Sequence, residues 1–264
     1  MSQLLFFDSG VGGLSVWQEV HHSLPQWQAI YAMDDAAFPY GELTESVLVA
    51  RVLAVFEEIA ARHPIALAVV ACNTASTLVL PELRARFDFP IVGVVPAIKP
   101  AALQTRSGKI GLLATPGTVN RPYTRQLEAD FAKDKTVLRL GSSELVIMAE
   151  AKLRGEPVDM ARLEGVLAPW LNGHGPDTVI LGCTHFPLLK EELAQVLGNG
   201  VILVDSGQAI ARRVASLLPQ ATGNKKGGLS HLYHTAEDPK GLALLRRWLQ
   251  PGAVPEFLPL HSSS

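Results

Sequence analysis

The sequence has little of several features that mark whole classes of protein. It contains two cysteines in 264 residues, too few to staple a secreted fold with disulfides and typical of a reducing compartment. No apolar run approaches the roughly 20 residues that a membrane-spanning helix requires. The N-terminus lacks the charged segment and cleavage site of a secretory signal. These absences predict a cytoplasmic protein that contacts no membrane.

Charge of one sign is also lacking. The 23 Lys and Arg residues nearly balance the 25 Asp and Glu residues, which leaves a formal net charge of −2. No basic stripe interleaved with aromatic residues is present, so nucleic acid is not an expected partner. The length is ample for a sizeable core, in one large domain or two modest ones.

Short apolar runs alternate with longer segments of helical period, which predicts the α/β class with mostly parallel sheets covered on both faces. The expected strands are residues 4–7, 29–32, 66–71, 91–95, 109–114, 136–140, 178–181, 201–204 and 229–235. The expected helices include residues 46–61, 119–131, 143–154, 163–171 and 188–197.

The chain is predicted to form two similar α/β domains. Residues 94–100 have the character of a crossover, so we expect a discontinuous first domain at 1–96 plus 206–264 and a second domain at 97–205. A coarse internal repeat supports this division, since Asp8-Ser9-Gly10 and Asp205-Ser206-Gly207 each follow a predicted strand.

The two cysteines occupy two copies of one local pattern. They lie in residues 67–74 (LAVVACNT) and 178–185 (TVILGCTH), where an apolar strand ends, a small residue follows, and polar side chains succeed the thiol. In a parallel sheet this is the edge where ligands bind. Two such sites facing each other would place a thiol on either side of one substrate, which suits proton removal from one face of a carbon and return to the other. The alternative for each cysteine is an inert, buried small hydrophobe.

Each thiol needs help to ionise, because a free cysteine has a pKa of about 8.5. Helices expected to begin after Cys72 and Cys183 would favour the thiolate through their N-termini. His185 lies two residues after Cys183, and if the strand continued both side chains would project to the same face. A thiol hydrolase with a Cys183–His185 dyad remains open, although it leaves Cys72 without a role. No paired-cysteine or clustered-histidine spacing is present, so no metal is expected.

Residues 8–13 (DSGVGG) close the first strand and open a helix, with glycines that allow backbone amides to approach an anion. The spacing is not that of a dinucleotide-binding turn, and only Asp34-Asp35 comes near the place of a ribose-binding acid, so no nucleotide cofactor is expected. Asp8 has the alternative role of a helix N-cap.

Short polar side chains flank the thiols. Asn73, Thr74 and Thr184 suit the orientation of a carboxylate and an ammonium group. The alternative is ordinary capping, by Thr74 or Ser76, of the helix predicted to start there. Pro39-Tyr40-Gly41 is a turn that carries an aromatic hydroxyl.

Five motifs in this order resemble the glutamate racemases of the aspartate/glutamate racemase family. They are residues 7–14 (FDSGVGGL), 38–41 (FPYG), 71–76 (ACNTAS), 93–97 (GVVPA) and 181–189 (LGCTHFPLL). The resemblance implies a racemase that needs no cofactor and interconverts L- and D-glutamate, supplying D-glutamate for peptidoglycan. It also implies two pseudo-symmetric α/β domains with the active site at their interface.

The resemblance assigns roles to particular residues. Cys72 and Cys183 match the two catalytic thiols, acting on the D- and L-isomer respectively, while Asp8 and His185 match the groups that assist them. The positions that match substrate-binding residues are Asp8, Ser9, Tyr40, Gly41, Asn73, Thr74, Thr184 and His185. Glu150 matches an acidic residue near the site, although residues 140–143 (LGSS) replace the Cys-Pro segment of many members.

Two further alternatives stay open. An aspartate racemase or another two-cysteine racemase would use the same pair of bases, and a non-catalytic amino-acid-binding protein would use the same pocket without turnover. The resemblance further implies a homodimer and, in some members, activation by a peptidoglycan precursor.

Overall fold

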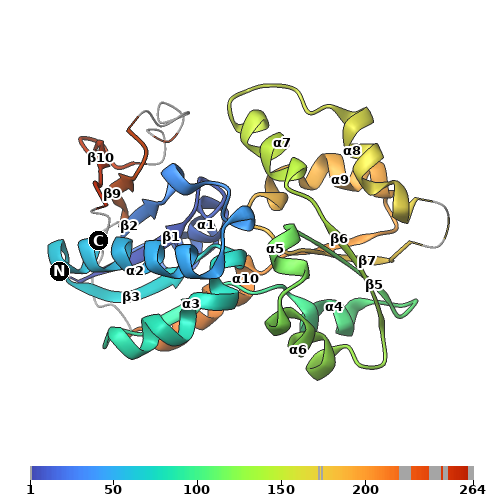
Figure 1. Cartoon of the computed structure of the whole chain (residues 1–264), viewed down its shortest axis with the longest axis horizontal. Coiled ribbons are helices and arrows are strands. Elements are labelled where there is room, and N and C mark those ends of the chain that lie inside the picture. The colour runs from blue at the N-terminus through green and yellow to red at the C-terminus, as the bar shows by residue number, and fades with distance from the viewer. Residues whose placement is uncertain are drawn as a thin grey trace. The chain divides into compact units, whose positions relative to one another are not determined.

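The computed structural model describes residues 2–171, 173, 175–219, 227–237, 245 and 249–260. The chain divides into two compact units, of which unit 1 comprises Met1–Val94 and Gly207–Ser264 and unit 2 comprises Val95–Ser206. Sequence analysis predicts the two crossings after residues 96 and 205. Each unit is built from a parallel sheet covered by helices, so the predicted α/β class is confirmed (Figure 1).

The strands and helices follow the alternation of the sequence. In chain order the strands are β1 (Gln3–Asp8), β2 (Gln28–Met33), β3 (Ile65–Val70), β4 (Ile91–Gly93), β5 (Lys109–Ala114), β6 (Thr136–Gly141), β7 (Thr178–Leu181), β8 (Ile202–Val204), β9 (Gly228–His234) and β10 (Pro255–Phe257). The α-helices are α1 (Leu14–Ser23), α2 (Glu45–Arg62), α3 (Asn73–Arg86), α4 (Ile98–Gln104), α5 (Pro116–Val119), α6 (Pro122–Phe131), α7 (Glu144–Leu153), α8 (Met160–Leu167), α9 (Lys190–Leu197) and α10 (Gly207–Leu217).

The sheet of unit 1 has the order β10-β9-β2-β1-β3-β4 and every pair in it is parallel. Because successive side chains of a strand point to opposite faces, Leu4 and Phe6 of β1 pack with α1 and α10. Leu5 and Phe7 pack with α2 and α3 on the other face. Both faces are thus buried, which explains why the strands read as continuous apolar runs.

The sheet of unit 2 has the order β6-β5-β7-β8, again with every pair parallel. Ile110 and Leu112 of β5 pack with Ile98 and Ala101 of α4 on one face. Helices α7, α8 and α9 lie on the opposite face (Figure 1).

The two sheets share one strand order, since β2-β1-β3-β4 in unit 1 corresponds to β6-β5-β7-β8 in unit 2. Cys72 and Cys183 follow the corresponding strands β3 and β7, so the cysteine repeat is a true structural repeat. The repeat drawn between Asp8-Ser9-Gly10 and Asp205-Ser206-Gly207 is wrong. The first segment follows β1, whereas the second follows β8, the counterpart of β4.

Several element boundaries differ from the prediction because prolines interrupt helical periodicity. The helix expected at 119–131 begins only at Pro122, because a separate short helix, α5, ends at Val119. The helix expected at 188–197 begins as a 3-10 turn, Phe186–Leu189, and becomes α-helical only at Lys190. Strand β10 was not predicted, since it is three residues long and begins with Pro255 at the sheet edge.

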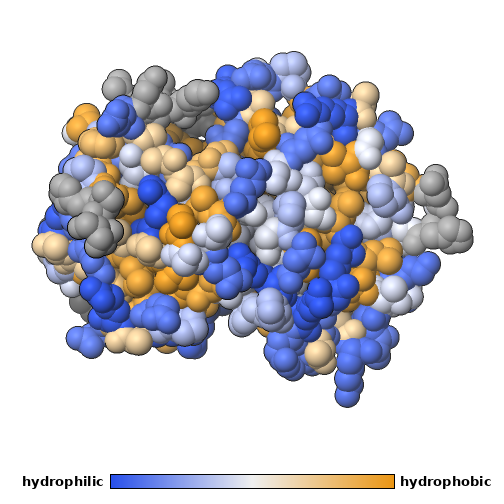
Figure 2. Space-filling view, in the orientation of Figure 1, coloured by the Kyte–Doolittle hydropathy of each residue, from blue (hydrophilic) through white to orange (hydrophobic). Residues whose placement is uncertain are grey.

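The visible surface mixes hydrophobic patches with hydrophilic residues that interrupt them (Figure 2). In unit 2 the exposed large hydrophobic residues come from α4, α6 and α7, namely Leu103, Tyr123, Phe131 and Ile147. Across the described ranges of the chain, no helix combines the length and apolar character needed to cross a membrane.

Candidate active site

Cys72 lies at the carboxyl edge of the unit 1 sheet, between β3 and α3. It is the N-cap of α3, and its sulfur accepts a hydrogen bond from the Ala75 backbone N–H at 3.5 Å. The first-turn amides of a helix carry partial positive charge, which favours a thiolate. The predicted helix N-terminus at this cysteine is therefore confirmed. The capping role considered for Thr74 or Ser76 is wrong, since the thiol itself occupies that place.

Ser76 has a different task. Its hydroxyl donates to the Val70 carbonyl at 2.9 Å and accepts from the Val94 backbone N–H at 3.1 Å. These bonds tie the first turn of α3 to the ends of β3 and β4, and so fix the backbone that carries Cys72.

Asp8 is the last residue of the neighbouring strand β1, and Ser9 follows it beside Cys72. The Ser9 hydroxyl oxygen lies 3.9 Å from the Cys72 sulfur, and the Ser9 backbone N–H donates to Asp8 Oδ1 at 2.7 Å. Asp8 is buried, with 1% of its surface exposed. Helix α1 begins at a Gly13 N-cap without any side-chain cap, so the alternative role of Asp8 as its N-cap is wrong.

The glycine-rich turn after β1 has a packing reason. A Cβ added at Gly13 would lie 2.8 Å from Tyr31 Oη and 2.9 Å from the Cβ atoms of Ala71 and Asp8. The Tyr31 hydroxyl also donates to the Gly10 carbonyl at 2.7 Å. Glycine thus lets the turn close against β2 and β3, and this closure holds Asp8 and Ser9 at the sheet edge.

Asn73 and Thr74 form the first turn of α3 and both are buried. The side-chain carbonyl oxygen of Asn73 accepts no hydrogen bond within the described structure. Buried polar atoms are normally paired, so this oxygen is an acceptor left for a donor such as an ammonium group. We call Asp8, Ser9, Cys72, Asn73 and Thr74 the Cys72 cluster.

Cys183 occupies the corresponding edge of the unit 2 sheet with different partners. Its sulfur lies 3.9 Å from His185 Nδ1, and His185 Nε2 lies 2.8 Å from Glu150 Oε1 on α7. We call Glu150, Cys183, Thr184 and His185 the Cys183 cluster; both Cys183 and Thr184 are buried. The contact of His185 with Glu150 was not predicted, because the two residues are distant in sequence.

The geometry around His185 differs from the expected strand. Strand β7 ends at Leu181, and His185 has helical backbone angles (φ −76°, ψ −28°) as the N-cap of the 3-10 turn. The turn, not a continued strand, brings the imidazole to the sulfur. Lys152, on the same helix as Glu150, donates to the Leu188 carbonyl at 2.8 Å and holds this turn in place.

His185 is fully buried, and burial alone would lower its pKa. The hydrogen bonds to Cys183 and Glu150, with the negative charges of the two groups, outweigh burial and raise the pKa of His185 to about 10. The imidazole is therefore a cation at neutral pH. A 3-10 turn, and not an α-helix, follows Cys183 directly, so the helix N-terminus predicted beside this thiol is absent, and the imidazolium lies 3.9 Å from the sulfur instead.

Strand register shows one position that sequence analysis missed. Ala71 donates its N–H to the Phe7 carbonyl, and Gly182 donates to the Leu113 carbonyl, each at 2.7 Å. Thr115 in unit 2 is thereby the counterpart of Ser9 in unit 1. Its hydroxyl lies 3.1 Å from that of Thr118, and both residues are buried. The only signal in the sequence was a threonine after an apolar run, which is too common to single out.

Tyr40 is buried and its hydroxyl donates to Asp34 Oδ2 at 2.5 Å. Burial raises the pKa of Tyr40 well above its usual value, and the charges of Asp34 and Cys72 raise it further. Gly41 lies in the same 3-10 turn, Tyr40–Glu42, which follows a cis Phe38–Pro39 bond. The Asp34 carboxylate is fully buried and already accepts hydrogen bonds from protein side chains, among them Tyr40 and Arg51. This disfavours the ribose-binding role considered for Asp34-Asp35.

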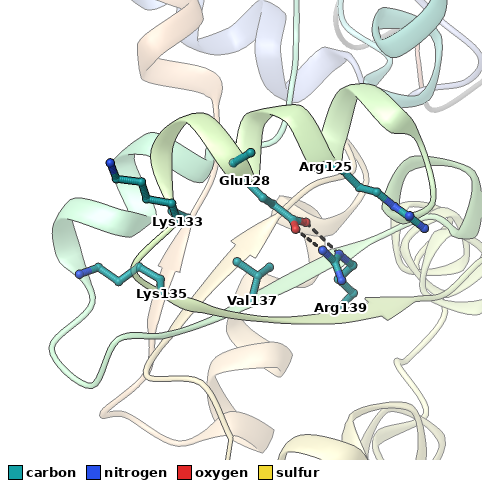
Figure 3. Close-up of a pocket in the computed structure, with 8 residues that line it drawn as sticks. Arg125, Glu128, Lys133, Lys135, Val137 and Arg139 are labelled. Atoms are coloured by element: carbon teal, nitrogen blue, oxygen red, sulfur yellow. Dashed lines mark hydrogen bonds and ion pairs between the residues drawn. The ribbon is translucent and has the colours of Figure 1, made fainter.

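A pocket of about 340 Å³ lies between α6 and β6 of unit 2, outside both clusters. Four cationic side chains line it, and the Glu128–Arg139 ion pair crosses it (Figure 3). None of its lining residues was predicted to carry chemistry. In the part of the chain that the structure describes, no three His, Cys, Asp or Glu side chains gather as a metal site.

Comparison with known proteins defines the class. The model of the Asp/Glu/hydantoin racemase family matches residues 13–214, and the chain belongs to this family. Among curated relatives, glutamate racemase from Escherichia coli K12 is 59% identical over 224 residues, which cover 84% of this chain and 79% of the relative. The glutamate racemase of Shigella flexneri matches to the same extent.

Solved structures agree. The crystal structure of E. coli glutamate racemase in complex with L-glutamate and the activator UDP-MurNAc-ala covers 99% of this chain and 100% of its own, with a TM-score of 0.91 and 51% identity. A glutamate racemase isoform from Bacillus anthracis covers 98% of both chains, with a TM-score of 0.84 and 27% identity. Within its family the chain thus groups with the glutamate racemases, which are isomerases.

Proposed function

We propose that this enzyme interconverts L- and D-glutamate by a two-base reaction in which Cys72 and Cys183 act on opposite faces of Cα. In this reaction the Cys72 cluster and the Cys183 cluster would act on the same substrate molecule. The observation that carries the proposal is the pair of buried thiols at equivalent edges of two sheets with one strand order.

From L-glutamate, the Cys183 thiolate takes the Cα proton, so the Cα–H bond breaks and an S–H bond forms. The Cys72 thiol then gives its proton to the opposite face of the carbanion and becomes a thiolate. The reverse direction exchanges the two roles. No outside acid, base or cofactor is consumed, and each turnover leaves the two sulfurs with exchanged protonation.

The neighbours of each sulfur support these roles. The α3 N-terminus favours a thiolate at Cys72, and the His185 imidazolium favours one at Cys183. Asp8 and His185 are proposed to assist proton movement at their cysteines. Buried, pre-oriented donors and acceptors replace the electron sink that a cofactor would supply.

Substrate binding is proposed for the polar residues around the two sulfurs. The unpaired Asn73 oxygen suits the ammonium group of the substrate, and the first-turn amides of α3 suit a carboxylate. The remaining binding residues in this proposal are Ser9, Tyr40, Gly41, Thr74, Thr184 and Glu150, the last acting through its contact with His185.

The test is a circular-dichroism progress curve started from each pure glutamate isomer, with no added cofactor. Approach to one racemic end point from both sides supports the proposal. An aspartate racemase, the alternative within the family, would give this result with aspartate and not with glutamate. A Cys183–His185 hydrolase or a binding protein would give no change in optical signal with either amino acid.

Biological setting extends the proposal. D-glutamate formed in the cytoplasm would supply peptidoglycan synthesis, and the E. coli relative is crystallised with UDP-MurNAc-ala as activator. We propose the same class of precursor as activator here, to be tested by its effect on turnover at subsaturating glutamate. A homodimer is expected and is tested by light scattering.

A further inference from the structure

Thr235 joins the end of β9 to the loop that follows β2. Its hydroxyl donates to Asp34 Oδ1 at 2.6 Å and accepts from the Ala36 backbone N–H at 3.1 Å. In return, Asp35 Oδ1 accepts from the backbone N–H groups of Thr235 and Ala236 at 2.8 and 2.9 Å. The two segments, about 200 residues apart in sequence, are therefore clamped from both sides.

Asp34 is the centre of this clamp and none of its surface is exposed. Besides the Thr235 hydroxyl, it accepts hydrogen bonds from Tyr40 Oη at 2.5 Å and from Arg51 Nε and Nη2 at 2.7 and 2.5 Å. A buried carboxylate depends on such donors, because each missing one leaves a desolvated lone pair.

The clamp reaches the Cys72 cluster by two routes. Tyr40, whose hydroxyl is held by Asp34, packs in the same buried hydrophobic cluster as Cys72, and the charge of Cys72 contributes to the raised pKa of Tyr40. The Asp34 backbone N–H also donates to the Asp8 carbonyl at 3.0 Å. The positions of Tyr40 and Asp8 therefore depend on Asp34, whose carboxylate is held in place in part by the Thr235 hydroxyl.

We propose that Thr235 is a positioning residue for the Cys72 cluster, acting through Asp34 and Tyr40. The end of β9 would then contribute to the Cys72 side of the site, although this strand lies beyond residue 214, where the family match ends. The expected effect of Thr235 on racemisation rests on the proposed function, whereas its expected effect on the reactivity of Cys72 does not.

The test uses the reactivity of the two cysteines in the folded, ligand-free enzyme. Both are buried, so alkylation by iodoacetamide depends on local opening, and peptide mass spectrometry gives a separate rate for each. Cys183 lies in the other unit and serves as an internal control. The variants are Thr235→Val, which keeps the shape and removes the hydroxyl, and Thr235→Ser, which keeps the hydroxyl.

Ser230→Ala is the matched control. Ser230 lies on the same strand β9 and its hydroxyl donates to the Ala29 carbonyl at 3.0 Å, but it is at the opposite end of the strand from the clamp. Loss of this hydroxyl tests whether any weakening of β9 is enough to expose Cys72.

We expect Thr235→Val to speed alkylation of Cys72 about threefold or more, with Cys183 unchanged. Thr235→Ser and Ser230→Ala should both keep the wild-type rate at Cys72. An unchanged Cys72 rate in Thr235→Val, or an equal rise at both cysteines, would overturn the proposal. If Thr235→Val does not fold, Asp35→Ala removes the other half of the clamp from a partly exposed position and must show the same selective rise.

Racemisation gives the second readout. Thr235→Val should raise the KM for glutamate about tenfold with a smaller change in kcat, and Thr235→Ser should restore it. If the wild-type enzyme racemises no glutamate, the proposed function fails, but the alkylation rates still decide whether Thr235 positions Cys72.

Discussion

The Cys72 and Cys183 clusters share a backbone plan and differ in what surrounds the sulfur. Each cysteine follows the third strand of the four-strand order that the two sheets share, β3 in unit 1 and β7 in unit 2, two residues after the strand ends. Cys72 caps a 14-residue α-helix, whereas Cys183 precedes a four-residue 3-10 turn and contacts a buried imidazole. The repeated fold fixes where the two thiols lie, and the local sequence decides which groups contact each sulfur.

The difference extends to the groups beside each thiol. Unit 1 carries a buried carboxylate, Asp8, at the end of β1, and the corresponding position at the end of β5 is Ala114. Unit 2 carries His185 two residues after its cysteine, where unit 1 has Thr74. The duplicated scaffold thus holds two thiols with different neighbours, which in the proposed reaction would control the two protons by different means.

Replacement of either thiol should have the largest effect. Cys72→Ser and Cys183→Ser should each lower kcat by about 10²- to 10⁴-fold, because a serine hydroxyl neither ionises nor transfers the proton in this range of pH. Steady-state racemisation from both isomers measures this loss. If Cys72→Ser keeps its activity, the two cysteines do not have equivalent roles, and the reaction would depend on the Cys183–His185 dyad alone.

Removal of the imidazolium should separate the two cysteines. His185→Gln should slow alkylation of Cys183 at pH 7 about tenfold, since its thiolate loses the neighbouring cation, and should leave Cys72 unchanged. The pH dependence of each alkylation rate measures the effect, with the exposed His22→Gln as control. Equal slowing of both thiols would mean that His185 acts on the fold and not on Cys183.

Glu150 should influence the Cys183 sulfur only indirectly, through its contact with His185. Glu150→Gln removes the charge that faces His185 Nε2, so the pKa of His185 should fall from about 10 by one unit or more. Imidazole NMR signals followed through a pH titration measure the fall. An unchanged titration would show that Glu150 contributes nothing to the charge of His185.

Stability should depend on pH through the same residue. The folded pKa of His185, about 10, lies above its ordinary value of 6.5, so the protonated form favours the folded state. This stabilisation is fully present below pH 6.5 and is lost as the pH rises toward 10. Urea unfolding should show a steeper loss of unfolding free energy over this window in the wild type than in His185→Gln. Parallel curves would contradict the raised pKa.

The smallest effect concerns the residue before each cysteine, Ala71 in unit 1 and Gly182 in unit 2. A Cβ at Gly182 would lie 3.0 Å from the Ala114 Cβ and 3.1 Å from the Leu113 carbonyl oxygen. Gly182→Ala should therefore lower the free energy of unfolding by about 1 kcal/mol, measured by urea denaturation. No loss would show that the unit 2 edge has the same room as the unit 1 edge.

Much of this comparison could be predicted from the sequence, because strands and cysteine motifs are local patterns. The nine predicted strands are present, and both thiols lie at the carboxyl edge of a parallel sheet. The helix expected at 188–197 is present from Lys190, but the prediction that a helix N-terminus lies beside Cys183 was wrong, since residues 186–189 form a 3-10 turn that periodicity does not distinguish from an α-helix.

What the sequence could not show are contacts made across the fold. The His185–Glu150 contact spans 35 residues and the Thr235–Asp34 contact spans 201. Such pairs leave no spacing rule in a single chain. The role of Asp8 was ambiguous for a related reason, because the choice between N-cap and buried carboxylate depends on where α1 begins.

The most direct test of two opposed bases is the fate of the Cα proton in D₂O. L-glutamate is incubated with enzyme for less than a tenth of the time to equilibrium, and the isomers are separated and analysed by NMR. The account predicts D-glutamate fully deuterated at Cα, since the second thiol carries a solvent-derived deuteron, with recovered L-glutamate still protonated. Protium retained in the D-glutamate, or deuterium entering recovered L-glutamate at the rate of inversion, would contradict it and point to a single base.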